Sequence, residues 1–361
     1  MQTLLNKKNV DIMKQPLFLV EDLALQRYDK FKYPVFFDLF QKQIGFFWRP
    51  EEIDLKKDRN DFKDSSVMSD NEKFIFTSNL KYQTMMDSVI CRGVPTLQSF
   101  VSNSELEASM NAWQFFEQIH SYSYTYIIKN VYADPSEILD SCLTDKEILA
   151  RASVAVKEYD ELAKLTNSKS IKNIKKQIYL TLISVNILEA VRFYVSFICA
   201  FAFAENKKMV GNADIIKFIK RDEALHLYNT QEIIKILHNV KSEGFLDTAK
   251  ECEEEACKMF ESAAKEEKRW ASYLFKDGSI IGLNEKVMSQ YIDWLCNSRM
   301  KVIGLPYESG FKNPISGWTD SWMNSEAVQP APQETEITSY KIGASNNDIE
   351  DTKFDFGDLG L

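Results

Sequence analysis

Apolar residues recur every three to four positions over most of the chain, a period that predicts long α-helices rather than strands. The first helical pattern begins near Pro34, and a later one follows Asp70, which is a candidate N-cap. A third helical pattern ends before Pro135, because proline cannot continue a helix interior. The expected helices cover about 34–48, 73–94, 104–131, 144–165, 171–205, 212–240, 246–275 and 284–303.

Several of these stretches exceed twenty residues and are apolar on more than one face, which is typical of helices inside a bundle. Glycine and proline are scarce, at 12 and 9 residues, and no internal repeat or run of strands is visible. We therefore expect an all-α bundle over residues 34–322, after an N-terminal extension at 1–33. The charged stretch "RPEEIDLKKDRNDF" is expected to be an irregular connection.

The pattern ends after Trp322, where small polar residues and two prolines replace the helical period. Residues 323–361 are therefore expected to form a flexible tail. Its acidic end carries four apolar residues, which could dock on a partner and become ordered there: Phe354, Phe356, Leu359 and Leu361.

Composition narrows the class of protein. The chain has 361 residues, of which 45% are hydrophobic, and its net charge is −9, which argues against a nucleic-acid-binding surface. The most apolar run, 193–204, is too short to cross a bilayer, and the N-terminus has no signal pattern, so we expect a cytoplasmic protein with no membrane association. Six scattered cysteines without a CxxC pair are expected to be reduced.

Two of the three histidines share one spacing. Glu117 precedes His120 by three residues, and Glu223 precedes His226 by three. Positions i and i+3 share a helix face, so each pair presents an oxygen and a nitrogen ligand together. A single such pair is more often an ordinary surface pair. Two pairs match a ferritin-like di-metal site, which also needs one carboxylate from each of two other helices.

Two carboxylates lie in suitably apolar surroundings, Asp87 in "QTMMDSVI" and Glu189 in "NILEAVRF". A buried carboxylate must be paired, protonated or bound to metal. Asp87 could instead lie on a helix surface, and Glu189 could pair with Arg192. The coincidence of four acids and two imidazoles favours a site for two cations, and this donor set suits iron or manganese.

Tyr124 lies on the same stripe as these ligands. A helix turns about 100° per residue, so Tyr124 returns to within about 20° of Glu117, whereas Tyr122 and Tyr126 lie on other faces. A core tyrosine with a bonded hydroxyl is the ordinary alternative to a redox-active phenol. Near the other predicted ligands, three apolar side chains could line a dry pocket around Tyr124: Phe193, Phe197 and Ile219. Apolar residues at helical spacing are more often ordinary core residues.

Six blocks of the sequence resemble, in order, the radical-generating small subunit of class I ribonucleotide reductase, most closely the aerobic bacterial and phage type. They are "RYDKFKYPVFFDLFQKQIGFFWRPEE", "FTSNLKYQTMMDSV", "EQIHSYSYTYIIKN", "NILEAVRFYVSFICAFAFAE", "RDEALHL" and "LFKDGSIIGLN". The resemblance spans about residues 15–345. It implies a ferritin-like homodimer whose di-iron centre uses O2 to generate a tyrosyl radical, with which the large catalytic subunit reduces ribonucleotides to deoxyribonucleotides.

The resemblance also implies roles for individual residues. One metal ion would be held by Asp87, Glu117 and His120, and the other by Glu189, Glu223 and His226. Tyr124 would carry the radical inside a cage of Phe193, Phe197 and Ile219. Trp48 and Asp222 would continue a hydrogen-bonded chain from His120, Tyr340 would relay the oxidising equivalent between subunits, and "FDFGDLGL" would dock on the large subunit. Tyr122 stands where relatives often have arginine.

Three other functions fit parts of the pattern. A di-iron oxygenase or desaturase would use the same four-helix site, but the position of Tyr124 and the Tyr340 tail favour the reductase. An iron-storage bundle fits the long acidic tail and the phenylalanine-rich surroundings poorly. A metal-free helical scaffold would leave the two Glu-x-x-His pairs unexplained.

Overall fold

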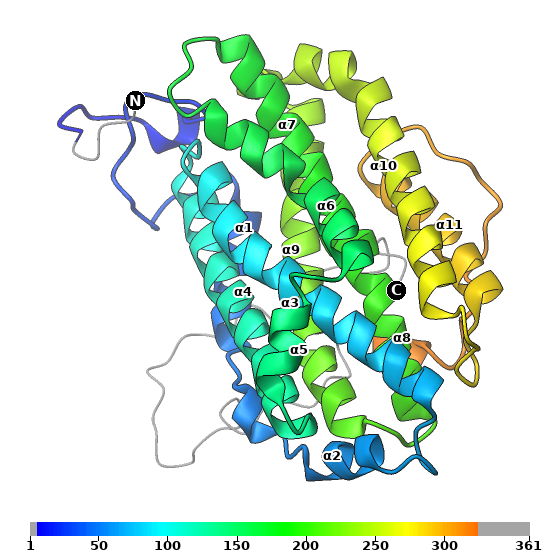
Figure 1. The fold of residues 1–361 in the computed structure, drawn as a ribbon. Helices are drawn as coiled ribbons and strands as arrows, with labels where there is room; N and C mark the ends of the chain where they lie inside the picture. The colour runs from blue at the N-terminus through cyan, green and yellow to red at the C-terminus, as the bar shows by residue number, and fades with distance from the viewer. Residues whose placement is uncertain (1–5, 324–361) are drawn as a thin grey trace, which may run out of the picture.

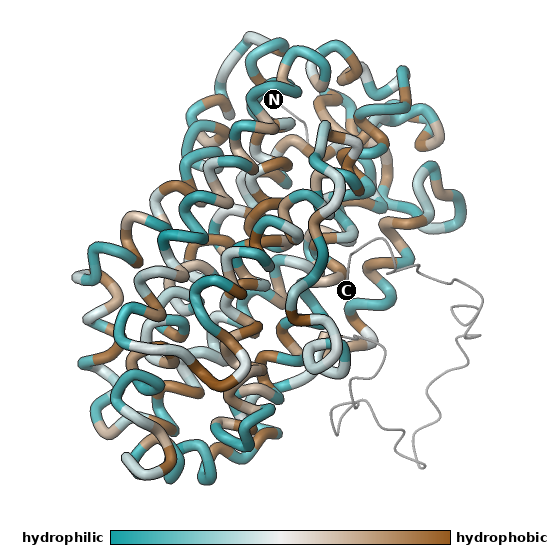
Figure 2. The backbone as a smooth tube through the Cα atoms, turned by 90° about the vertical axis from the view of Figure 1, so that its right-hand side faces the viewer, coloured by the Kyte–Doolittle hydropathy of each residue, from teal (hydrophilic) through white to brown (hydrophobic). Residues whose placement is uncertain are grey.

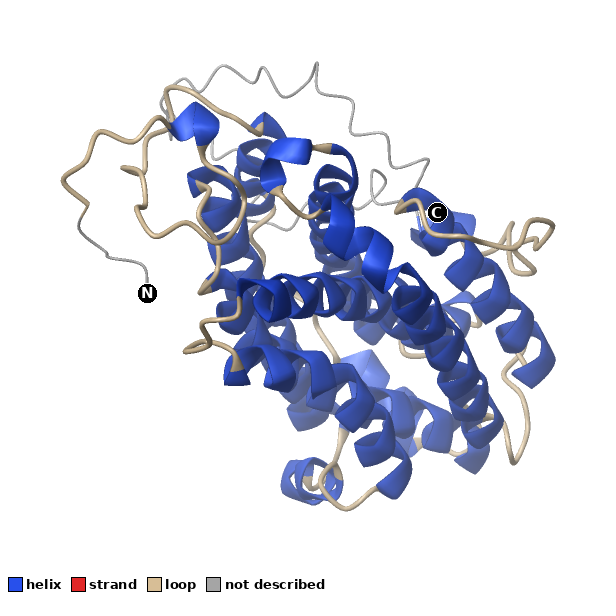
Figure 3. Cartoon of the chain, turned by 90° about the horizontal axis from the view of Figure 1, so that it is seen from above, coloured by secondary structure: helices blue, strands red, loops and turns tan. Residues whose placement is uncertain are grey.

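The computed structural model describes residues 6–323, and from Pro34 onward this part of the chain consists mainly of long helices packed side by side (Figure 1). This part contains helices and loops, with two isolated β-bridges and no strand (Figure 3). The helices are α1 Pro34–Gly45, α2 Lys56–Lys63, α3 Asp70–Gln98, α4 Ser104–Val131, α5 Pro135–Ser141, α6 Lys146–Lys164, α7 Ile171–Ile187, α8 Phe193–Glu205, α9 Val210–Asn239, α10 Leu246–Leu274, α11 Glu285–Val302 and α12 Asp320–Met323. The expected all-α fold is confirmed.

Side-chain caps fix where the central helices begin. Ser69 and Glu72 form a reciprocal capping box, so α3 begins one residue after Ser69 and the expected cap Asp70 is its first helical residue. Asn103 accepts a hydrogen bond from the Leu106 N–H at 2.9 Å and caps α4. The ends of α4 are those that the sequence predicts.

The core lies between α3, α4, α7, α8 and α9, and every residue of α8 from Phe193 to Ala204 is buried. Hydrophobic and hydrophilic stretches alternate along much of the tube in Figure 2. The helical run Ile171–Glu205 is long and apolar enough to cross a membrane, but its most apolar window is entirely buried inside the protein. It is therefore a core helix of the bundle.

This long helix departs from the expected regular form in one turn. Leu188–Arg192 is a π-helix that joins α7 to α8, so the prediction of one continuous α-helix over 171–205 is wrong at this point. A π turn adds one residue to the α-helical spacing and often occurs at functional sites. Glu189, a predicted metal ligand, lies in this turn.

The stretch predicted to be irregular, 49–62, is instead largely helical. It contains the short helix η2 Pro50–Glu52 and most of α2, and the prediction is wrong because few apolar residues mark these turns. An acidic side chain of α2 fixes this segment against α9. Asp58 accepts hydrogen bonds from the backbone N–H groups of Gly211 and Asn212, at 3.0 and 2.8 Å, and so caps the first turn of α9.

Gly211 is required by this contact. A Cβ at this position would lie 2.8 Å from Asp58 Oδ2 and 2.9 Å from Leu55 Cδ2. The close approach of α2 to α9 therefore depends on the missing side chain. It brings the chain segment after Trp48 against the helix that carries the second Glu-x-x-His pair.

The remaining expectations concern the ends of the chain. Before α1, Leu17 and Phe18 are buried against the bundle, and Leu17 donates its backbone N–H to Glu243 at 2.6 Å. The predicted flexible tail, including Tyr340 and the terminal "FDFGDLGL", lies outside the described residues from position 324 onward. All six cysteines are free, as expected.

Candidate metal centre

The two Glu-x-x-His pairs face each other across α4 and α9. Each imidazole approaches the glutamate of the other helix: His120 Nδ1 lies 3.2 Å from Glu223 Oε1, and His226 Nδ1 lies 3.0 Å from Glu117 Oε1. All four side chains are almost fully buried. The i, i+3 spacing therefore places both pairs on inward faces, as the sequence predicts.

Asp87 from α3 and Glu189 from the π turn complete the cluster. Ligand atoms of two overlapping groups lie within 4.8 Å of one another. The first group holds Asp87, Glu117, His120 and Glu223, and the second holds Glu117, Glu189, Glu223 and His226. Glu117 and Glu223 belong to both groups, so these carboxylates can serve two adjacent cations.

The donor atoms fit a pair of metal ions. Both carboxylate oxygens of Asp87 and of Glu189 are buried without a hydrogen-bond partner, as are Glu117 Oε2, Glu223 Oε1 and His120 Nδ1. Unpaired buried carboxylates are costly, and bound cations remove this cost. Four carboxylates and two imidazoles are oxygen and nitrogen donors that suit iron or manganese, so the cluster is a di-metal site.

Electrostatics supports this assignment. Burial, followed by the charge of Glu117, raises the pKa of Asp87 well above its ordinary value, and burial with the charge of Glu223 does the same for Glu189. Burial also favours the neutral form of Glu223, but the neighbouring Glu189 carboxyl and the charges of His226 and His120 lower its pKa. Without cations, the cluster must hold protons in place of metal.

Two neighbours of the cluster were not predicted. Trp113 donates its indole N–H to Glu117 Oε1 at 2.7 Å and stacks on His226 with ring centroids 5.2 Å apart. The side-chain amide of Gln43, from α1, lies against His226 Nε2. Such contacts orient metal ligands. Trp113 precedes Glu117 by four residues, which was an available signal, whereas nothing in the pattern singled out Gln43.

Tyr124 is fully buried, one turn after His120 on α4. Burial, followed by the charge of Asp87, holds the pKa of its phenol well above the ordinary value, so the neutral phenol is strongly favoured. Its hydroxyl has no hydrogen-bond partner among the described residues. The expected cage residues Phe193, Phe197 and Ile219 are also fully buried. The rings of Phe193 and Phe197 stack with their centroids 5.8 Å apart.

Trp48 and Asp222 lie on the opposite side of His120 from the metal ligands. Trp48 donates its indole N–H to Asp222 Oδ2 at 2.7 Å, and the same oxygen lies 3.2 Å from His120 Nε2. Both residues are fully buried. A continuous hydrogen-bonded chain therefore connects His120, a predicted metal ligand, to Trp48.

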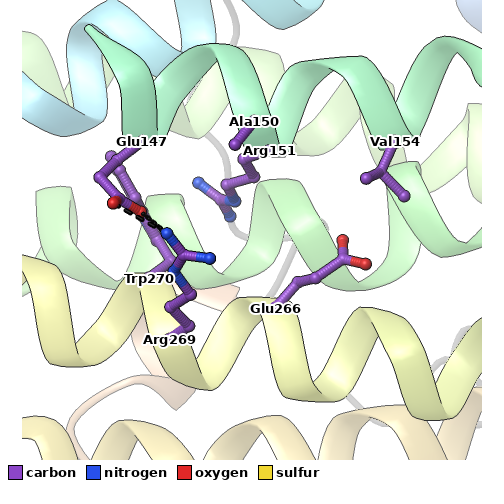
Figure 4. A pocket seen from close by; sticks show the side chains of 7 residues that line it. All are labelled: Glu147, Ala150, Arg151, Val154, Glu266, Arg269 and Trp270. Atoms are coloured by element: carbon purple, nitrogen blue, oxygen red, sulfur yellow. Dashed lines mark hydrogen bonds and ion pairs between the residues drawn. The ribbon is translucent and has the colours of Figure 1, made fainter.

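A separate pocket of about 180 Å³ lies between α6 and α10 (Figure 4). Its charged residues pair with one another or with neighbours. Arg269 contacts both carboxylate oxygens of Glu147 at 2.9 Å, and Arg151 binds the buried Glu267. No predicted site residue lines this pocket.

Comparisons with known proteins agree with this site. A sequence model of the family described as "Ribonucleotide reductase, small chain" matches residues 26–314. The chain is 47% identical to "Ribonucleoside-diphosphate reductase subunit beta" of Buchnera aphidicola subsp. Schizaphis graminum, over 98% of each chain. It is 40% identical to the protein of the same name from Enterobacteria phage T4, over 97% of each chain.

A solved structure has the same architecture. The "Ribonucleotide reductase R2 subunit from Clostridium botulinum" superimposes with a TM-score of 0.76 at 28% identity, covering 86% of this chain and 94% of that one. The fold, the cluster of buried ligands and these relatives agree. The chain therefore belongs to the family of ribonucleotide reductase small chains, the beta subunits of ribonucleoside-diphosphate reductase.

Proposed function

We propose that this subunit holds two iron ions, uses O2 to oxidise Tyr124 to a stable neutral radical, and lends that radical to the large subunit for ribonucleotide reduction. One observation carries the proposal: a fully buried phenol with no hydrogen-bond partner among the described residues lies one helical turn from a six-ligand cluster. Iron and manganese suit the same ligands, and the choice of iron rests on the family resemblance.

The proposed ligand assignment is the one that the family resemblance implies, and the two overlapping groups of the cluster are compatible with it. Asp87, Glu117 and His120 would hold one ion, and Glu189, Glu223 and His226 the other. When bound, iron supplies the chemistry of O2 activation. The protein supplies a dry site and fixed ligand orientations, the latter through Trp113 and Gln43.

Tyr124 is suited to one-electron oxidation with loss of its proton. Its hydroxyl lies close enough to Asp87 for the charge of that carboxylate to raise the pKa of the phenol, so Asp87 can receive the phenolic proton. The buried Phe193, Phe197 and Ile219 would exclude water and reductants from the radical. These roles complete the assignment of the inward-facing site.

The radical must then leave this buried site. Trp48 and Asp222 provide a bonded path from His120 toward the surface segment 49–53. Tyr340, outside the described residues, would carry the equivalent onward, and the terminal "FDFGDLGL" would bind the large subunit. As a small chain of ribonucleotide reductase, the protein has the large subunit as its partner.

A homodimer is proposed as well. Apolar side chains are exposed at the end of α1 and on α4, where the rings of Phe47 and Phe115 stack 6.1 Å apart and Ile44 is 47% exposed. A second copy could cover this surface. We place the protein in the cytoplasm, because the apolar run 171–205 is buried in the bundle.

Electron paramagnetic resonance after anaerobic loading with Fe(II) and admission of O2 tests the central proposal. A tyrosyl signal that is lost in Tyr124→Phe is the expected result. Metal uptake or substrate hydroxylation without any such signal would support iron storage or oxygenase activity instead.

Truncation tests the tail. A chain ending after Tyr340 should form the radical normally but show no turnover with the large subunit, because the docking segment is lost. Turnover at the full rate would show that the docking assignment is wrong.

A further inference from the structure

The two tyrosines that flank Tyr124 point away from the metal centre. Tyr122 and Tyr126 are four residues apart on α4, so they share a face, and that face is roughly opposite to the one that carries Tyr124. Tyr122 is 46% exposed, and Tyr126 is half-buried. Neither residue touches the ligand cluster, and the proposed function assigns neither a role.

Both phenols donate hydrogen bonds to the segment that directly follows Trp48. The Tyr122 hydroxyl donates to Glu51 Oε1 at 2.5 Å, and the Tyr126 hydroxyl donates to the backbone carbonyl of Ile53 at 3.0 Å. Glu51 lies in η2, which begins two residues after Trp48. The two bonds therefore attach one surface turn to α4 at two points.

Few other polar contacts hold this turn in place. Arg49 donates its backbone N–H to Glu52, and its guanidinium lies 3.5 Å from Glu51, so both of these contacts remain inside the segment. Within the described part of the chain, the two phenols make the only hydrogen bonds between residues 49–53 and other elements. The turn is also held by packing, since Pro50 is buried and Ile53 packs against the core, and the two phenols add its hydrogen bonds to α4.

The turn is short enough to transmit this restraint to Trp48. Trp48 is adjacent to Arg49, and its indole must reach Asp222 on α9, which in turn contacts His120 on α4. The phenols, two and six residues after His120, hold the same segment from the surface side. Helix α4 thus holds both ends of the connection between His120 and Trp48. It carries the imidazole of His120, and its two phenols bind the backbone segment next to Trp48.

We propose that Tyr122 and Tyr126 are positioning residues for Trp48, which hold its indole N–H on Asp222 by restraining residues 49–53 against α4. This inference rests on the relay role that the proposed function gives to Trp48. Charge supports the geometry, because the Tyr122 hydrogen bond lowers the pKa of Glu51 and so keeps it an ionised acceptor.

The first test measures the indole directly and needs no metal. The metal-free full chain is labelled with ¹⁵N-tryptophan, and the Trp48 indole signal is identified by its loss in Trp48→Phe. Hydrogen exchange of this N–H should be at least about threefold faster in the Tyr122→Phe/Tyr126→Phe double variant, because the turn opens more often.

Two further variants separate positioning from general loosening. Tyr132→Phe is the matched control, because it removes a phenol hydrogen bond to Thr77 from the end of the same helix without touching residues 49–53. Its Trp48 exchange should equal that of the parent. Tyr122→Arg keeps a donor for the Glu51 carboxylate, so exchange in this variant should be slower than in Tyr122→Phe and close to the parent rate.

The second test measures turnover with the large subunit. The double variant should lose about tenfold in maximal rate, with the half-saturating concentration of large subunit and the sedimentation behaviour unchanged, because the relay geometry is altered and the docking tail is not. Unchanged indole exchange in the double variant would overturn the inference. If Trp48→Phe retained full turnover, the relay role would be refuted, while the exchange measurement would still decide the positioning.

Discussion

Trp48 and Asp222, 174 residues apart in sequence, share a 2.7 Å hydrogen bond in the interior of the bundle. The accepting oxygen, Oδ2, also lies 3.2 Å from the imidazole of His120. Asp222 Oδ2, on α9, therefore contacts both Trp48, which follows α1, and His120 on α4. The link is local in space, although it connects three distant parts of the chain.

Replacing this carboxylate by an amide should weaken the link without removing bulk. Asp222→Asn keeps an oxygen that can accept from both Trp48 and His120, but it removes the negative charge that strengthens both contacts. Turnover with the large subunit should fall about 10–100-fold, the range found when outer contacts of metal ligands are removed. A rate within about twofold of the parent, at equal metal content, would contradict the assignment.

Metal binding should stabilise the folded chain. Mn(II) added to the metal-free protein relieves the unpaired carboxylates, and free metal at about 100 times its Kd should add about 2.7 kcal/mol per site to the free energy of unfolding. Calorimetry against a chelator reference measures this gain. Glu117→Gln, which weakens a carboxylate common to both ligand groups, should reduce the gain, whereas the distant Glu147→Gln should not.

The buried ion-pair cluster beside the π turn should be costly to break, because removing one partner leaves buried charge uncompensated. Glu267 is fully buried and accepts hydrogen bonds from Arg151 Nε at 2.8 Å and from Arg192 Nη1 at 3.0 Å. Glu267→Ala leaves two buried guanidinium groups without this partner and should cost about 3–5 kcal/mol in urea unfolding. Glu147→Ala, which breaks the exposed pair with Arg269 in Figure 4, should cost less than about 1 kcal/mol.

The contact between α2 and α9 gives a prediction about backbone packing. Gly211→Ala places a Cβ 2.8 Å from Asp58 Oδ2 and should destabilise the fold by about 1–3 kcal/mol, because the cap must move. Gly45→Ala is the matched control, since no atom lies within 4 Å of the position that a Cβ would take there, and no loss is expected. Equal unfolding free energies for the two variants would show that the close approach is unimportant.

Because of His238, the third histidine, we expect the free energy of unfolding to fall as the pH is lowered. Burial lowers the pKa of His238 below its ordinary value of 6.5, although the charge of Glu253 opposes this, and its Nε2 lies 2.8 Å from the Tyr179 hydroxyl. The unfolded chain then binds the proton first as pH falls, so this contribution to stability is present above pH 6.5 and is lost as pH falls through the lowered pKa. His238→Gln should flatten the decline below that pH by up to about 1.4 kcal/mol per pH unit. A decline as steep as in the parent would exclude His238 as its source.

Sequence spacing was sufficient to predict that the two Glu-x-x-His pairs face inward together, because an α-helix places residues three positions apart on one face. Glu117 with His120, and Glu223 with His226, required only that α4 and α9 be regular, and both helices are. The first and last residues of α4 were equally predictable from sequence, since Asn103 caps its start and Pro135 begins the next helix after its end. Local rules determine these features.

Features set by contacts between distant segments were not predictable in this way. Helix α2 has little apolar character of its own, and its Asp58 is explained only by the N–H groups of α9. Gln43 is one polar residue among several on α1 until His226 is placed beside it. The roles of such residues arise from tertiary neighbours, which a single sequence does not display.

The π turn that carries Glu189 has a consequence for the length of its helix. The turn accommodates one residue more than an α-helical turn, so deleting one residue between Leu188 and Arg192 would give an ordinary α-helix and leave α7 and α8 facing their present neighbours. The side chains inside the turn would change direction, and Glu189 is one of them. The length of this helix is therefore tied to the placement of one carboxylate rather than to the packing of the bundle, and a one-residue deletion should remove that carboxylate from the cluster while the fold is kept.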